Sequence, residues 1–136
     1  IEICAAHFIP YAATASVGFP QDLQKKVKKA LEIRGPKYIQ VHVPCPLGWG
    51  HPSNLTIEIA KRAVNSGLYP LVEYEYGKMT RVFKVSKIIP VEEYINLQAR
   101  FRHLLQDKEA LNSLQEVANK NIEYYGLGNP LKVTIS

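Results

Sequence analysis

One stretch, residues 37–50, sets the strongest limit on how this chain can fold. Its first half, Lys-Tyr-Ile-Gln-Val-His-Val, alternates and is rich in β-branched residues, which predicts a strand that is at least half buried. Its second half holds Cys45 between two prolines, and two glycines flank Trp49 and allow a tight reversal. In an α/β sheet, the carboxyl end of a strand is where chemistry is presented. A thiolate held in this way suits a metal or an iron–sulfur cluster, whose other ligands must lie elsewhere.

Composition narrows the class of protein. The chain has 136 residues and 46% hydrophobic content, which fits one domain with one sizeable core. No apolar run approaches the roughly 20 residues that a membrane span needs, and no signal peptide is recognised. Two cysteines in dissimilar settings do not resemble a secreted disulfide framework. A cytoplasmic protein without a membrane partner is therefore expected.

The basic charge is concentrated in one segment. The net charge is +5, and Lys25, Lys26, Lys28 and Lys29 lie close together. This run is typical of the solvated face of an amphipathic helix, with nucleic acid or an acidic protein as alternative partners. No aromatic residues interleave with these lysines as a stacking platform would need, so nucleic acid is not expected.

Strand and helix patterns alternate along the chain, which predicts an α/β fold with a partly parallel sheet. A helix over 21–33 is expected to bury Leu23, Val27, Ala30 and Leu31 while its lysines face water. A two-residue turn of type II′ at Gly77-Lys78 ends the parallel pattern. The expected strands are 11–16, 37–43, 68–76 and 79–85, with further helices from about 53, from about 91 and over 108–124.

The ends of the chain carry weaker signals. Residues 1–10 begin without a methionine and without a helix-start signal, and they are typical of the last turns of a helix leading into a strand. We therefore expect a piece of a longer chain that leaves an apolar sheet face or edge uncovered. Cys4, beside two alanines, is expected to be a small buried hydrophobe. The tail, 126–136, fits either a strand added to a neighbour or a surface segment.

Three chemistries can be built on Cys45. With His42 and His51 it gives a spacing that could hold zinc, although no second cysteine completes a knuckle. With a histidine it could be a nucleophile beside its base, which would make the chain a small α/β thiol enzyme. As a third alternative, Cys45 is one ligand of a cluster completed outside the chain, and on spacing alone a merely structural cysteine ranks ahead of it.

Several segments together resemble one family, the β subunit of pyruvate:ferredoxin oxidoreductase (pyruvate synthase), in its C-terminal half. The likeness runs from residue 1 to about 105, and the last thirty residues or so carry little of it. The segments are Tyr-Ala-Ala-Thr-Ala-Ser at 11–16, Gly-Pro-Lys-Tyr-Ile at 35–39, Pro-Cys-Pro-Leu-Gly-Trp at 44–49, Pro-Val-Glu-Glu-Tyr at 90–94 and Arg-Phe-Arg-His at 100–103.

The resemblance implies a fold and a reaction. The fold would be the C-terminal part of a thiamine diphosphate-binding α/β domain over 1–76, with a mostly parallel sheet, and a terminal hairpin with C-terminal helices over 77–136. Such enzymes decarboxylate pyruvate or a related 2-oxoacid on thiamine diphosphate and Mg²⁺. They pass electrons through 4Fe–4S clusters to ferredoxin and transfer the acyl group to coenzyme A.

Only one site residue is carried over by the resemblance. Cys45 matches the fourth cysteine ligand of the cluster nearest the thiamine cofactor, and Trp49 is expected to help shield it. The other three cluster cysteines and the motif that binds Mg²⁺ and diphosphate are absent from the 136 residues. The expected partners are therefore the N-terminal half of the subunit, the other subunits and ferredoxin, which the lysine face could dock. No catalytic or cofactor-binding residue is assigned, and the 2-oxoacid and the role of 106–136 stay open.

Overall fold

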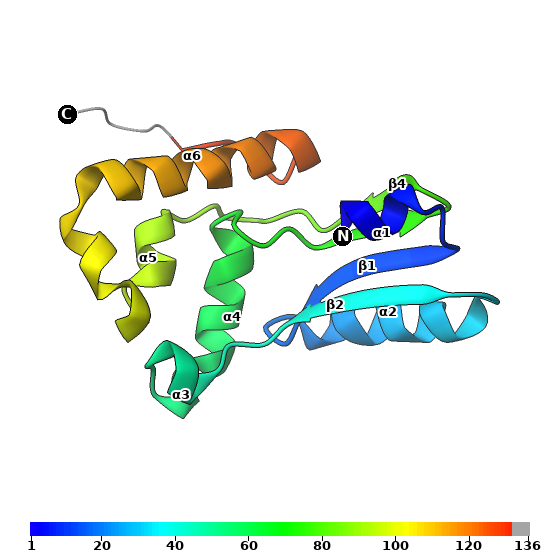
Figure 1. Cartoon of the computed structure of the whole chain (residues 1–136), viewed down its shortest axis with the longest axis horizontal. Coiled ribbons are helices and arrows are strands. Elements are labelled where there is room, and N and C mark those ends of the chain that lie inside the picture. Colours follow the sequence, from blue (N-terminus) through cyan, green and yellow to red (C-terminus); the bar gives the residue numbers. More distant parts are fainter. Residues whose placement is uncertain (132–136) are drawn as a thin grey trace.

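The computed structural model describes residues 1–131 and shows an α/β arrangement in which a four-stranded sheet lies beside a helical region (Figure 1). The part of the tail at 132–136, where an added strand was one expectation, lies outside the described residues. The helices are α1 (Glu2–Ala6), α2 (Pro20–Glu32), α3 (Pro46–Trp49), α4 (Thr56–Asn65), α5 (Val91–Ile95) and α6 (Lys108–Tyr125), with 3₁₀ segments η1 (Ser53–Leu55) and η2 (Ala99–Gln106). The strands are β1 (Tyr11–Ser16), β2 (Lys37–His42), β3 (Val72–Glu75) and β4 (Lys78–Val82).

The sheet is mixed. Its strand order is β2-β1-β3-β4, and only β1 and β2 pair in parallel, through the α2 crossover. The β1–β3 and β3–β4 pairs are antiparallel, so the expectation of a mostly parallel sheet is corrected in this detail. The α/β class itself is confirmed, and it is compatible with the C-terminal part of a thiamine diphosphate-binding fold.

The expectation of a half-buried strand at 37–43 is wrong for the described residues. All six residues of β1 are buried at the centre of the sheet, whereas β2 is an edge strand with four of its six residues exposed. The strand expected at 68–76 is the shorter β3, which pairs with β1 on the side opposite to β2. A β-branched pattern identifies a strand correctly, but its burial depends on a neighbour that the pattern does not supply.

The β3–β4 hairpin turns at Tyr76 and Gly77, one residue earlier than predicted. Both residues have positive φ, 48° for Tyr76 and 78° for Gly77. This is the type I′ pattern and not the type II′ pattern expected at Gly77-Lys78, because type I′ requires positive φ at both central residues.

Helix α2 forms where it was predicted, but its buried face is rotated from the expected one, and of the expected core residues only Ala30 is buried while Leu23 is half-buried. Asp22, Lys26 and Ala30 face the sheet, whereas Val27 and Leu31 are exposed. The prediction that the lysines face water is therefore wrong for Lys26, which is only 1% exposed.

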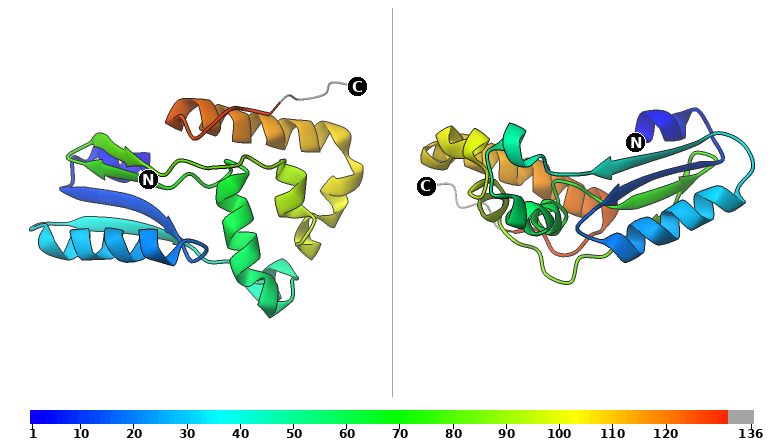
Figure 2. Two further views of the ribbon diagram at one scale, coloured as in Figure 1. Left: turned by 180° about the vertical axis from the view of Figure 1, so that it is seen from behind. Right: turned by 90° about the horizontal axis from the view of Figure 1, so that it is seen from below.

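The helical region packs around α4. Ile59 and Ala63 of α4 are buried against Tyr94 and Ile95 of α5, and α6 crosses the same region (Figure 2). The single helix expected from 91 is instead the short α5 followed by η2, while α6 matches the helix expected over 108–124. Within residues 1–131, no helix has the length and apolar character that crossing a membrane requires.

Candidate functional site

The candidate site is the turn that follows β2. Pro44 is fully buried, whereas Cys45, the next residue, is exposed with a free thiol. Cys45 is the N-cap of α3, and its carbonyl oxygen accepts a hydrogen bond from the Trp49 amide at 3.0 Å. Its Sγ accepts from the Gly48 amide at 3.5 Å. The thiol is thus presented to the exterior by a backbone that is anchored immediately before it.

The other end of the turn is attached to η2. Gly50 adopts φ of 67°, and its carbonyl oxygen accepts from the Ala99 amide at 3.1 Å. A Cβ at Gly50 would stand 2.6 Å from the Ala99 Cβ, closer than any allowed contact. The glycine is needed here for both its positive φ and this close approach.

A cation–π stack also joins the turn to η2. The Arg100 guanidinium lies 3.7 Å from the centroid of the Trp49 ring and 4.4 Å from that of Phe101. Arg100 is held in place because its Nε and Nη2 donate to Oε1 of the buried Gln98, at 3.1 and 2.9 Å. Sequence reasoning noted the Arg-Phe-Arg-His segment but missed this stack, since about fifty residues separate its members.

His42 and His51 do not join Cys45 in a metal site. His42 packs its ring 4.8 Å from Tyr69 and 5.6 Å from Trp49, and burial with the nearby charge of Arg100 lowers the pKa of His42 to about 4. His51 Nδ1 lies 2.9 Å from the Pro52 carbonyl oxygen. Among residues 1–131, no three His, Cys, Asp or Glu side chains are gathered as metal ligands, so the three-residue zinc alternative is not supported.

No hydrogen bond joins Cys45 to a histidine among residues 1–131, so the nucleophile–base alternative gains no support from the structure. His42 Nδ1 is buried without a hydrogen-bond partner in the described part of the chain, and the sulfur of Cys45 is hydrogen-bonded to the Gly48 amide. Cys4 is partly buried and packs against the cluster of Ala5, Ala12, Val72 and Tyr74, as expected of a small hydrophobe.

A second group of polar residues lies between α2 and the sheet, and sequence reasoning missed it. Lys26 Nζ donates to Asp22 Oδ2 at 2.5 Å and to the Thr14 carbonyl oxygen at 2.8 Å. Glu73 of β3 accepts from Tyr11 at 2.8 Å and pairs with Arg81 at 3.0 Å. We call these residues, together with Lys29, the charged layer.

Burial and pairing oppose each other in the charged layer. Burial lowers the pKa of Lys26 even though Asp22 stabilises its charged form. Burial alone would raise the pKa of Glu73, but hydrogen bonds from Tyr11, Lys29 and Arg81 outweigh it, and the pKa of Glu73 is lowered. The charged layer is a structural ion-pair network, because Asp22 pairs with Lys26 and Glu73 pairs with Lys29 and Arg81.

The comparisons with known proteins agree with the predicted resemblance. The chain is 48% identical over 128 residues to the pyruvate synthase subunit PorB of Methanosarcina barkeri, covering 92% of this chain and 43% of that protein. It is 46% identical to PorB of Methanocaldococcus jannaschii, again over 92% of this chain and 41% of the relative. It is 48% identical to the ketoisovalerate oxidoreductase subunit VorB of Pyrococcus abyssi, over 85% of this chain and 37% of the relative. No protein-family model matches the chain.

By its sequence the chain is similar to the subunits of two oxidoreductases, pyruvate synthase and ketoisovalerate oxidoreductase. More particularly, it is similar to their PorB and VorB subunits, and the predicted resemblance is confirmed. The chain spans about two fifths of the length of the curated relatives that it matches, which is consistent with a C-terminal half.

Proposed function

We propose that the chain is part of the β subunit of a 2-oxoacid:ferredoxin oxidoreductase, a cytoplasmic enzyme that converts pyruvate or a related 2-oxoacid to acyl-CoA and CO₂. The relatives are named for two different substrates, pyruvate and ketoisovalerate, at closely similar identity. The substrate class is therefore proposed, and the particular 2-oxoacid is left open between them.

We further propose that Cys45 supplies one thiolate ligand of a 4Fe–4S cluster. The observation that carries this proposal is the combination of an exposed, free thiol with an anchored backbone at the end of β2. The donor set fits one ligand of a cluster that is completed elsewhere, because residues 1–131 gather no group of three His, Cys, Asp or Glu side chains as metal ligands. The other ligands, with thiamine diphosphate and Mg²⁺, would be held by polypeptide outside these 136 residues.

The local geometry supports this role for the sulfur. The Gly48 amide points its N–H at Sγ, a contact that stabilises negative charge on sulfur and tunes a cluster. A Cβ at Gly48 would stand 3.4 Å from Sγ, so the glycine leaves that side of the sulfur open. The two prolines restrict the chain on either side of Cys45, so little backbone entropy is lost when the sulfur is captured. A bound cluster would supply one-electron transfer.

The remaining residues of the site would hold the turn and limit access of water. Trp49, stacked beneath Arg100, is proposed to shield one side of the cluster. We also propose the division of the chain into 1–76, as part of the thiamine diphosphate-binding domain, and 77–136, as an extension. Ferredoxin and the other oxidoreductase subunits are the proposed partners.

The test compares the two cysteines of the chain in the complete enzyme. Cys45→Ala should lower cluster iron and leave a labile or three-iron cluster, seen by iron content and low-temperature EPR, while thiamine diphosphate still binds. Electron delivery to ferredoxin should fall by orders of magnitude. Cys4→Ala is the matched control and should leave the cluster signal intact. An unchanged cluster with full turnover in the Cys45→Ala enzyme would reduce Cys45 to a structural cysteine.

A further inference from the structure

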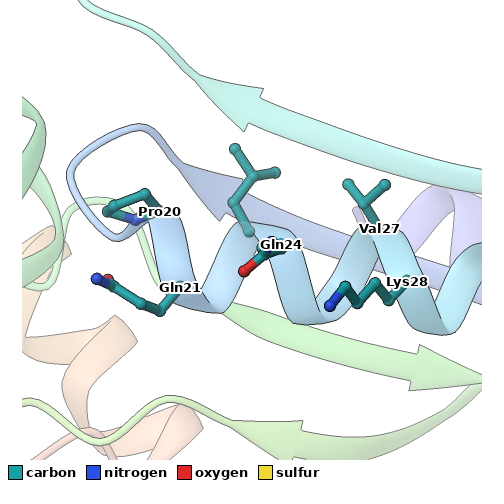
Figure 3. A pocket seen from close by; sticks show the side chains of 6 residues that line it. Pro20, Gln21, Gln24, Val27 and Lys28 are labelled. Carbon is teal, nitrogen blue, oxygen red and sulfur yellow. The ribbon is translucent and has the colours of Figure 1, made fainter.

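Part of the surface of α2 is apolar. Leu23, Val27 and Leu31 follow one another at four-residue spacing and form a stripe along the helix. Leu31 is 78% exposed and Val27 is 41% exposed. Leu23 and Val27, with Pro20 and Gln24, line an open pocket of 510 Å³ on this side (Figure 3). A stripe of this kind is normally buried against another element.

The edge of the sheet beside α2 is also open. One side of β2 pairs with β1, and the strand order leaves its other side unpaired within the described residues. Tyr38, Val41 and Val43 are exposed along this edge. Edge strands are usually blunted by bulges, prolines or several charges, but Lys37 is the only charged residue in β2. We call the stripe and this edge together the α2/β2 surface.

Charge selects the kind of partner that fits this surface. Its exposed flanking residues are four cations, Lys25, Lys28, Arg34 and Lys37, and one acid, Glu32. A second copy of the chain would bring the same cations against themselves, which is repulsive. A partner with acidic residues around an apolar strip is therefore the complementary one.

We propose that the α2/β2 surface binds a strand followed by an acidic amphipathic helix, supplied by the part of the subunit that this chain does not span. The strand would pair along β2, and the helix would cover Leu23, Val27 and Leu31. The identity of the partner rests on the proposed function. More than half of the Methanosarcina barkeri relative lies outside the match, which easily accommodates the roughly 30 residues of such a unit.

The experiment co-expresses this chain with the unmatched portion of Methanosarcina barkeri PorB and measures the dissociation constant of the purified complex by sedimentation velocity. Val27→Glu combined with Leu31→Glu should raise that constant at least tenfold. Val117→Glu, at a half-exposed valine of α6, is the matched control and should leave it unchanged. Lys28→Glu should weaken binding at low salt more than at high salt. Amides of β2 should gain protection from hydrogen exchange in the complex.

Three results would overturn the proposal. They are an unchanged dissociation constant for the Val27/Leu31 variant, unchanged exchange of the β2 amides on binding, and a dimer of the chain alone that the same variant dissociates. The proposed function and the docking surface can be disproved independently of each other. The Cys45→Ala chain should bind the PorB portion as tightly as the unaltered chain, so loss of cluster chemistry at Cys45 would leave the docking result standing. Conversely, Cys45 could prove to ligate a four-iron cluster while the Val27/Leu31 variant leaves the dissociation constant unchanged. That pair of results would support the proposed function and rule out the docking surface.

Discussion

Helices α2 and α4 are both amphipathic, yet they bury opposite kinds of residue. Helix α4 buries Ile59, Ala60, Ala63 and Val64 and keeps the Arg62–Glu58 ion pair on its outer side. Helix α2 buries Asp22 and Lys26 beside Ala30 and turns Val27 and Leu31 outward. An amphipathic pattern therefore predicts a helix with two faces, whereas the neighbours of the helix decide which of the faces is buried.

The neighbours of the two helices explain the difference. Helix α4 lies against α5 and the leucines of η2 and α6, which offer apolar surface. Helix α2 lies over Glu73 and Arg81, whose charges need partners. Lys29 and Asp22 of α2 pair with Glu73 and Arg81, at 3.1 and 3.8 Å, so the charged side of the helix turns toward the sheet and two aliphatic side chains are left exposed.

The largest effect should come from the apolar contact of α4. Ile59→Ala removes a fully buried side chain, and such truncations lower the free energy of unfolding by about 2–5 kcal/mol. Urea unfolding followed by circular dichroism measures this. Ile57→Ala, at an exposed position of the same helix, is the control and should cost less than about 1 kcal/mol. Equal losses from the two variants would contradict the packing described for α4.

The corresponding change in α2 concerns charge. Lys26→Met leaves the buried Asp22 with only the longer ion pair to Arg81 at 3.8 Å, which should lower the free energy of unfolding by about 3 kcal/mol. Lys25→Met, at the exposed neighbouring lysine, should change it by no more than about 0.5 kcal/mol. Adding Asp22→Asn to Lys26→Met should restore part of the loss, because no buried charge then stays unpaired. If Lys25 and Lys26 prove equivalent, α2 packs with its lysines in water as the sequence suggested.

Acid should weaken the α2 side of the molecule through Glu73. Its pKa is lowered from 4.5 in the folded chain, so its stabilising contribution is complete above about pH 4.5 and is lost as pH falls through the folded pKa. The difference in unfolding free energy between the native chain and Glu73→Gln should therefore shrink as pH is lowered from 7 to 3.5. Urea titrations at several pH values measure that difference, and a constant gap would show that Glu73 carries no such linkage.

Periodicity and turn residues were enough to locate most of the elements, because these depend on local sequence. They placed β1, α2, β2 and α6 within a residue or two, and they placed Cys45 at the end of a strand. They failed where a distant neighbour decides the outcome. The inward side of α2 depends on Glu73 and Arg81, and the exposure of β2 depends on a strand that residues 1–131 do not provide.

The candidate site likewise has a part that the local sequence predicts and a part that depends on distant residues. The proline-bracketed cysteine was visible as a local motif, and its proposed role came from the resemblance. The attachment of the turn to η2, through Gly50 and the Arg100–Trp49 stack, is a contact between segments about fifty residues apart. No spacing rule for a strand or helix connects such positions, so only the three-dimensional arrangement reveals them.

The smallest effect is expected at Leu31, and it tests the comparison most sharply. Leu31 is 78% exposed, so Leu31→Ala removes little buried surface and should change the free energy of unfolding of the monomeric chain by no more than about 0.5 kcal/mol. A Leu→Ala change at a buried leucine lowers the free energy of unfolding by about 2–5 kcal/mol. Urea unfolding should be measured at several protein concentrations, because association through the α2/β2 surface would make the apparent stability depend on concentration. A loss of more than about 2 kcal/mol in the free energy of unfolding at the lowest protein concentration would mean that Leu31 is buried within the chain. The apolar side of α2 would then be buried, as that of α4 is.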